Sequence, residues 1–359
     1  MTNTAELARA FEIQSGACAA FGSAFSAGLL GRAKQDIEDG GPLSGLLTPW
    51  ADASTRALIG DAVPLRWLGC LHDLVLSGED ATLAGSYPTP GSPGDVDEAW
   101  AAAKAAMISR PERFCTFMAH EPQTNEVRRS AALLPGFLVL AREIGLPFRI
   151  FEIGASAGLN QLWDRYHYDL GEAGVWGDPT SKVRLDTEWR REPPPIGAAV
   201  SVISRAACDR KPVDLTDPIA RRRLKAFIWP DQFERLARLE AAIETALAAR
   251  VTVEAEDAVT WVAAKAAPIS GAVTVIFHSI FWQYMPPESQ AAATAAIEGL
   301  GAQATDAAPL AWLRMEPPPG NLATVELRLT IWPGGDDRLL GHAHPHGAWV
   351  EWSPTGAPA

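Results

Sequence analysis

The sequence predicts an α/β protein, with a mostly parallel sheet closed by an antiparallel C-terminal hairpin and preceded by an α-helical region. Three observations support this fold class. Residues 1 to 147 carry apolar side chains at helical spacing. After Pro147, short apolar strands alternate with amphipathic helices, the pattern of a parallel sheet. Near the C-terminus two alternating segments flank Gly334-Gly335-Asp336-Asp337, which indicates a hairpin.

The first part of the chain divides into helices and one loop. Residues 65–76 place apolar side chains on one helical face, and Gly78 is a suitable helix stop. The Pro- and Gly-rich segment 87–94 predicts a loop. Further helices are expected over about 95–109, from Pro111 and from about Thr124. We therefore expect a helical domain over 1–147 and an α/β domain over 148–359.

The second part carries the strand and helix signals of the α/β domain. Strands are predicted at 149–153, 200–204, 251–254, 273–277 and 310–315, and in the two arms of the hairpin, 324–332 and 338–352. Helices are predicted over about 230–250, 259–266 and 287–300. The segment 171–195 fits neither pattern, and we expect an insertion over the sheet.

Composition limits the classes of function. The net charge of -12 disfavours binding to nucleic acid. No apolar run approaches the ~20 residues that span a bilayer, and the N-terminus lacks the features of a signal peptide. The four cysteines are dispersed and form no CxxC pair. We expect a cytoplasmic protein with a small-molecule substrate, no nucleic acid, no membrane and no metal; the oligomeric state stays open.

The most informative stretch is residues 150–160, a predicted strand followed by a turn of small residues. Glu152 lies at the end of this strand, where open α/β sheets hold their ligands. Small residues let a ligand approach the main chain closely. The pattern around Gly154, Ser156 and Gly158 resembles the first motif of class I methyltransferases that use S-adenosylmethionine. It also spells G-x-S-x-G, the nucleophile elbow of α/β-hydrolases, and small residues are common in any strand-to-helix turn.

Residues after the later strands favour the methyltransferase interpretation. Asp209 follows the second strand and Asp257 the third, and carboxylates accept hydrogen bonds from ribose hydroxyls or an adenine amino group. The next strand ends at His278, and the residues after it resemble the fourth methyltransferase motif. A hydrolase with Ser156 as nucleophile would use Asp257 and His278, but no HGGG oxyanion motif is present.

The chain also resembles DUF2332, a bacterial family, over nearly its whole length. The segments that carry this resemblance are residues 65–72, 123–127, 151–160, 208–209 and 277–284.

The methyltransferase resemblance implies a Rossmann-like methyltransferase sheet over 148–359 and a set of residues that bind the cofactor. S-adenosylmethionine would be bound by Glu152, Gly154, Ser156, Gly158, Asn160, Asp209 and Asp257. Ser156 stands where a glycine is commoner. The candidate catalytic residues are His278, Glu126 and Tyr284, and the candidate substrate contacts are Asn125 and Trp282. His278 also fits a buried core histidine, and Asn125 also fits a helix N-cap.

The function predicted from these residues is transfer of a methyl group from S-adenosylmethionine to a small molecule, with the helical region as a lid. Two alternatives stay open. One is a serine hydrolase that uses Ser156, and the other is a non-catalytic binding protein that keeps the fold.

Overall fold

The computed structural model describes residues 4–321 and 323–353, and the chain forms two compact units. The helical unit consists of Met1–Thr124 and Thr216–Ala237, and the α/β unit of Asn125–Leu215 and Arg238–Ala359. This division differs from the predicted boundary at residue 147. The helix expected from Thr124 begins at Arg129 and packs on the sheet, and a later segment returns to the helical unit.

The helices of the helical unit agree closely with the sequence signals. Gly78 ends its helix, in the left-handed conformation, and Pro111 opens another, as predicted; the helix expected over about 95–109 begins at Val96 and is capped by Asp95. The elements are α1 (Thr4–Ala20), α2 (Ala24–Glu38), α3 (Pro42–Leu46), η1 (Thr48–Trp50), α4 (Thr55–Gly60), α5 (Val63–Ser77), α6 (Ala81–Ser86), α7 (Val96–Ser109), α8 (Pro111–Met118) and α10 (Pro218–Ala226).

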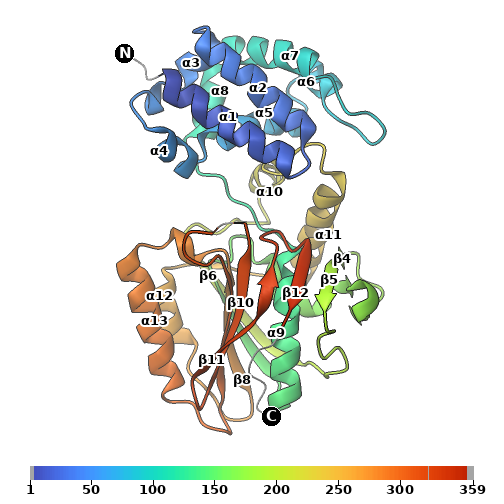
Figure 1. The fold of residues 1–359 in the computed structure, drawn as a ribbon, viewed down its shortest axis with the longest axis vertical. Helices are drawn as coiled ribbons and strands as arrows, with labels where there is room; N and C mark the ends of the chain where they lie inside the picture. Colours follow the sequence, from blue (N-terminus) through green and yellow to red (C-terminus); the bar gives the residue numbers. More distant parts are fainter. Residues whose placement is uncertain (1–3, 322, 354–359) are drawn as a thin grey trace. The chain divides into compact units, whose positions relative to one another are not determined.

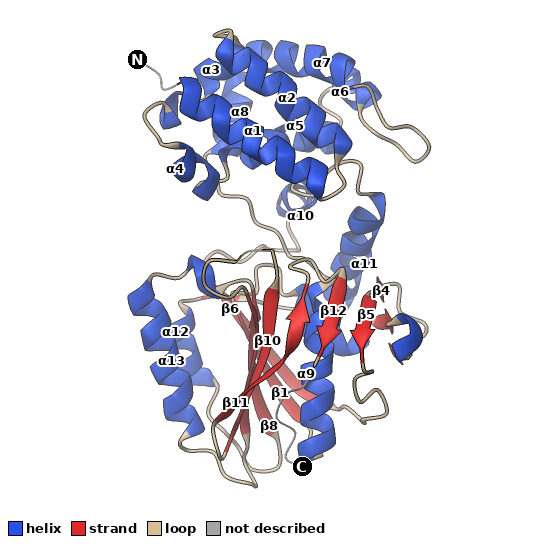
Figure 2. Cartoon of the chain, viewed as in Figure 1, coloured by secondary structure: helices blue, strands red, loops and turns tan. Residues whose placement is uncertain are grey.

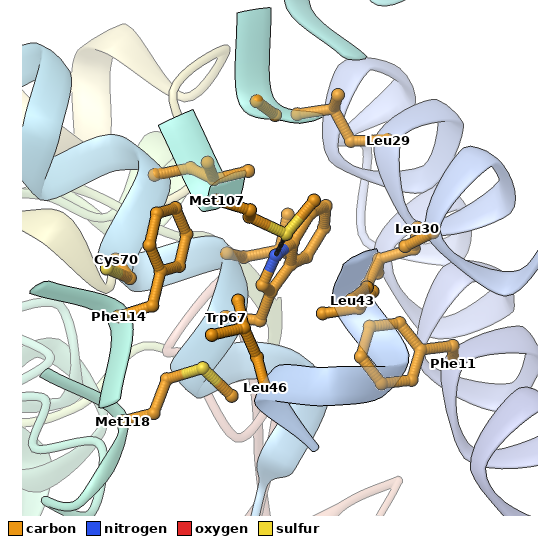
Figure 3. Close-up of a cluster of buried hydrophobic side chains, with 14 of the residues drawn as sticks. Phe11, Leu29, Leu30, Leu43, Leu46, Trp67, Cys70, Met107, Phe114 and Met118 are labelled. Atoms are coloured by element: carbon orange, nitrogen blue, oxygen red, sulfur yellow. Dashed lines mark hydrogen bonds between the residues drawn. The ribbon is translucent and has the colours of Figure 1, made fainter. Parts of the chain in front are cut away.

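Trp67 of α5 lies in the middle of the core of the helical unit (Figure 3). It is fully buried, and its indole N–H donates to the sulfur of Met107 over 3.4 Å. The returning segment completes this unit. Phe227 packs where a Cβ on Gly69 would lie 2.6 Å from its ring, and the His72 imidazole donates to the carbonyl of Ile228 over 2.8 Å. The long-range packing explains why residues 216–237 belong here.

The α/β unit contains a nine-stranded sheet of order β5-β12-β11-β10-β9-β8-β1-β6-β7 (Figures 1 and 2). Strands β7, β6, β1, β8 and β9 are parallel, and β9 to β12 are antiparallel neighbours, which confirms the mostly parallel sheet with a C-terminal hairpin. Its strands are β1 (Phe148–Ile153), β5 (Glu188–Arg191), β6 (Val202–Asp209), β7 (Glu254–Ala255), β8 (Val273–Ser279), β9 (Leu310–Glu316), β10 (Val325–Trp332), β11 (Asp336–Ala343) and β12 (Trp349–Trp352).

Helices cover both faces of this sheet (Figure 2). One face packs against α9, where Gly136 allows the side chain of Leu313 to approach. The other face packs against α12 and α13, and Trp312 belongs to its core. The helices of the unit are α9 (Arg129–Ile144), α11 (Phe233–Ala249), which starts in the helical unit, α12 (Ala258–Lys265), α13 (Pro287–Gly301), η2 (Leu159–Arg165), η3 (Gly171–Ala173) and η4 (Trp282–Tyr284).

Two segments differ from their predictions. The stretch after the glycine turn is η2, a short 3₁₀ segment, rather than a regular helix. The segment 171–195 contains the short strands β3 (Val175–Gly177), β4 (Arg184–Asp186) and β5. Strands β3 and β4 pair with β2 (His167–Asp169), which lies just before the segment, and β5 extends the edge of the main sheet. Within the described residues, no helix combines the length and the apolar character needed to span a membrane.

Candidate functional site

The turn after β1, residues 154–158, lies where the strand order of the sheet reverses. The chain continues from β1 to β6 on one side, whereas β8 pairs with β1 on the other. Ligands of open α/β sheets bind at the carboxyl ends of the strands at such a point. Gly154 has a φ of 67° and Ser156 a φ of 53°, so the turn contains a serine in the left-handed region that favours glycine.

Two predicted site residues hold this turn in place through its main chain. Asp209, the last residue of β6, accepts hydrogen bonds from the Ser156 N–H over 2.8 Å and the Lys211 N–H over 2.9 Å. The amide oxygen of Asn125 accepts from the Leu159 N–H over 2.9 Å. Asn125 therefore caps the start of η2, which lies 34 residues further along the chain.

Asn160 and Glu126 also connect the turn to the segment before α9. The Ser130 hydroxyl donates to the Asn160 side-chain oxygen over 2.7 Å, and the Asn160 amide donates to the Glu126 carbonyl over 3.4 Å. The Glu126 carboxylate accepts from the Arg128 N–H over 3.2 Å. Both Asn160 and Glu126 are buried. The residues just before α9 and at its start are thus brought against the glycine turn.

Glu152 is the most unusual group at the turn. Its side chain is 3% exposed, and its Oε2 atom has no hydrogen-bond partner among the described residues. Burial raises the pKa of this carboxyl well above its ordinary 4.5, the nearby Asp209 raises it further, and Arg129 lowers it. The Ser156 hydroxyl is buried and equally unpartnered within the described chain. Unsatisfied buried polar atoms are rare, and both of these belong to the predicted motif.

The two glycines of the turn are closely packed by other side chains. A Cβ on Gly154 would lie 2.1 Å from the ring of Phe281. A Cβ on Gly158 would lie 2.8 Å from Val253 and 2.9 Å from Val251. Part of the glycine requirement of this turn therefore comes from packing within the protein.

His278 lies on the opposite face of the sheet from Glu152. Glu152 pairs with Phe277 in the register of β1 and β8, so the next residue of β8 points to the other side. His278 is fully buried, its Nδ1 lies 2.6 Å from a carboxylate oxygen of Glu316, and Nε2 lies 3.1 Å from the indole nitrogen of Trp312. Since an indole N–H only donates, Nε2 accepts and Nδ1 carries the proton.

This arrangement leaves His278 no nitrogen with which to take a proton from a substrate. The same geometry bears on the hydrolase alternative, in which the imidazole Nε2 must face the nucleophilic hydroxyl. Here Nε2 faces Trp312, and the Ser156 hydroxyl has no base within hydrogen-bond distance among the described residues. The geometry therefore does not support Ser156 as a nucleophile activated by His278.

The remaining predicted residues follow β7 and β8 in the chain. Asp257 is exposed and caps α12 by accepting from the Val259 N–H over 3.0 Å. Tyr284 is 75% exposed. Trp282 stacks on the His278 imidazole with ring centroids 5.0 Å apart, on the α13 face. Tyr284 and Trp282 thus lie in η4, after the strand that carries His278.

A cavity of about 360 Å³ lies on the α13 face, against β9, β10 and β11. His278 and Trp282 belong to its lining, but most of the lining was not predicted. Its principal side chains beyond those two are Trp312, Arg314, Glu316, Arg328, Trp332 and Asp337. The sequence does contain a signal for them. Tryptophan, arginine and glutamate alternate along β9, and such alternation places all three side chains on one face of a strand.

A family model described as "Uncharacterized protein conserved in bacteria (DUF2332)" matches residues 8–352 of the chain. No curated protein and no solved structure matches the chain.

Proposed function

Because the chain belongs to the DUF2332 family, whose description names no activity, we propose a function from the site itself: methyl transfer from S-adenosylmethionine to a small molecule. The observation that carries this proposal is the buried Glu152 carboxylate, with its free Oε2 atom, at the end of the central parallel strand. A buried carboxylate oxygen without a donor is costly, and a cationic donor on a ligand would satisfy it.

The charges at the turn fit this cofactor. Asp209 adds negative charge near the Glu152 carboxyl and raises its pKa, whereas the guanidinium group of Arg129 lowers it. S-adenosylmethionine supplies an activated methyl group when bound, and it carries a positive sulfonium and an ammonium group. Glu152 would hold the ammonium group, Asp209 the ribose hydroxyls and Asp257 the adenine. The chain would contribute orientation and exclusion of water, which supply much of the rate in such transfers. We assign no general base.

Phe281 determines whether a ligand can lie on Gly154. Its ring occupies the space directly above the glycine, and the residue before it, Ile280, has a φ of 48°. A β-branched residue in the left-handed region is strained, and such strain is concentrated at functional sites. We propose that the Phe281 ring moves away from Gly154 when the cofactor binds. A cofactor that lies along the turn then replaces the packing that the ring provides.

Calorimetric titration with S-adenosylmethionine and S-adenosylhomocysteine tests the proposal. We expect the wild type to bind both, Glu152→Gln to bind at least tenfold more weakly, and Phe281→Ala to bind more tightly because no ring has to move. Glu288→Gln, an exposed site in the first turn of α13, is the control for loss of one negative charge. Absence of binding to both the wild type and Phe281→Ala would overturn the proposal.

A further inference from the structure

The cavity on the α13 face, defined above, has three indole rings in its walls. Trp282 and Trp312 have ring centroids 5.5 Å apart at an angle of 54°, and Trp332 of β10 also lines the cavity. Gly301 of α13 makes room for Trp332, because a Cβ there would lie 2.5 Å from the indole. Indole faces carry negative potential and attract organic cations.

The cavity is exposed to a ligand because of the way the chain connects β9 to β10. The two strands follow each other directly as antiparallel neighbours, with Pro317, Pro318 and Pro319 at the start of the connection. The connection therefore contains no described helix that would cover this face of the hairpin. Side chains of β9 and β10 are left to line the cavity beside α13.

The charges in the cavity are unbalanced toward the negative. Four carboxylates line it, and only two guanidinium groups. Arg328 pairs with Glu326 over 3.0 Å and with Asp337 over 2.8 Å, and Arg314 also pairs with Asp337. Because these pairs use both arginines, Glu316 and the exposed Glu298 leave an excess of negative charge in the lining.

The pairing of β9 with β10 is further evidence that the charged residues on the cavity face of these strands are not arranged for stability alone. Glu316 lies directly opposite Glu326, and Arg314 directly opposite Arg328. Like charges in opposite positions of an antiparallel pair are destabilising. Asp337 pairs with both arginines, whereas Glu316, opposite Glu326, has no guanidinium partner among the described residues, so this acidic pair adds negative charge to the cavity.

Glu316 is held in a fixed position and has one oxygen left over. Its Oε1 atom accepts from the His278 imidazole over 2.6 Å and from the Phe281 N–H over 3.0 Å. Its Oε2 atom is buried and has no partner in the described part of the chain. Arg314 Nε is also buried without a described partner, so the lining of the cavity holds one unsatisfied acceptor and one unsatisfied donor.

We propose that this cavity is a binding site for a protonated organic amine, with the ammonium group donating to Glu316 Oε2 and lying against the indole rings of Trp282 and Trp332, because the guanidinium group of Arg314 already lies over Trp312, 4.2 Å from its ring centroid. An oxygen acceptor elsewhere in the ligand would satisfy Arg314 Nε. The Glu152 side chain faces away from the cavity and no residue of the glycine turn belongs to the described lining, so the inference does not depend on the proposed methyl transfer.

Three related probes separate charge, hydrogen bonding and shape: benzylamine, benzyltrimethylammonium and benzyl alcohol. Titration of the full chain, without any cofactor, is followed by ligand-observed nuclear magnetic resonance. We expect benzylamine to bind most tightly, benzyltrimethylammonium more weakly because it has no N–H donor, and benzyl alcohol at least tenfold more weakly than the amine. Equal binding of the amine and the alcohol would overturn the proposal, and so would absence of binding by the amine.

Two variants locate the site. Glu316→Gln keeps an acceptor for His278 and Phe281 but removes the charge, so we expect at least tenfold weaker binding of benzylamine. Trp282→Leu keeps apolar volume but removes one indole face, and we expect a severalfold loss. Glu288→Gln, outside the lining, changes the net charge equally and is expected to bind as the wild type does. If Glu288→Gln weakens binding as much as Glu316→Gln, the proposed location is wrong.

Discussion

The two faces of the sheet in the α/β unit differ in how their polar groups are used. On the α9 face, the glycine turn has a recognisable sequence motif, yet much of it is satisfied internally. Asp209 and Asn125 hold its N–H groups, and Phe281 covers Gly154. On the α13 face only His278 and Trp282 belong to a predicted motif, and most of the cavity lining, with the unsatisfied groups of Glu316 and Arg314, lies outside it.

This difference shows that a motif and a binding site are separate properties of a chain. Glycines in a turn can serve the packing of the protein itself, as Val251 and Val253 show at Gly158. Phe281 connects the two faces, since its ring packs on Gly154 and its N–H donates to Glu316. A ligand that displaces this residue on one face will therefore affect the carboxylate on the other.

The largest expected effect is on the α13 face, in the variant Glu316→Ala. It leaves the fully buried His278 N–H and the Phe281 N–H without an acceptor, which we expect to lower the free energy of unfolding by about 3 kcal/mol. Urea unfolding measures the change. Glu326→Ala, at the opposite position of β10, is partly exposed and should change stability by less than about 1 kcal/mol. Equal losses would show that Glu316 has no special structural role.

On the α9 face we expect a substitution to raise the free energy of unfolding instead of lowering it. Glu152→Gln removes a buried charge that lacks a partner, and we expect it to raise the free energy of unfolding by about 1–2 kcal/mol at pH 8. The pKa of Glu152 is raised in the folded protein. The contribution of this carboxyl to stability is therefore complete below pH 4.5 and is lost as the pH rises. The advantage of the variant should therefore grow between pH 5 and pH 8 in urea unfolding. An advantage that is independent of pH would contradict the buried charge.

A smaller loss is expected where the turn is capped from a distant segment. Asn125→Ala removes the acceptor of the Leu159 N–H and should lower the free energy of unfolding by about 1 kcal/mol. Asn125→Asp keeps an acceptor and should recover most of that loss. If both variants lose stability equally, the hydrogen bond is not the reason.

The smallest effect is expected at Ser156, which combines a left-handed conformation with an unpartnered hydroxyl. Ser156→Gly should raise the free energy of unfolding by about 0.5–1 kcal/mol, because glycine adopts this conformation without strain. Ala62→Gly, at a φ of 51° and without a hydroxyl, measures the backbone contribution alone. If Ser156→Gly lowers the free energy of unfolding while Ala62→Gly raises it, the Ser156 hydroxyl is stabilising.

The sequence signals indicated the helical region, most strands of the main sheet and their directions, but not β2 to β5 or the 3₁₀ segment η2. Helices begin or end at signals in adjacent residues, namely Gly78, Asp95 and Pro111. The apolar run of β8 indicates a strand that is covered on both faces. These signals work because their physical causes extend over only a few residues. The boundaries of β6, β7 and α9 differ from the predictions because pairing and packing with distant segments decide where those elements begin and end.

The tertiary structure alone decided which groups meet. The strand register places Glu152 and His278 on opposite faces of the sheet, although the sequence predicted both residues to belong to one site. The pairing of β9 with β10 collected the charged lining of the cavity, and the fold brought Asn125 to the turn. Residues 216–237 joined the helical unit through Phe227. None of these contacts has a local signature, because each partner satisfies its hydrogen bonds and packing only through a segment far away in the chain.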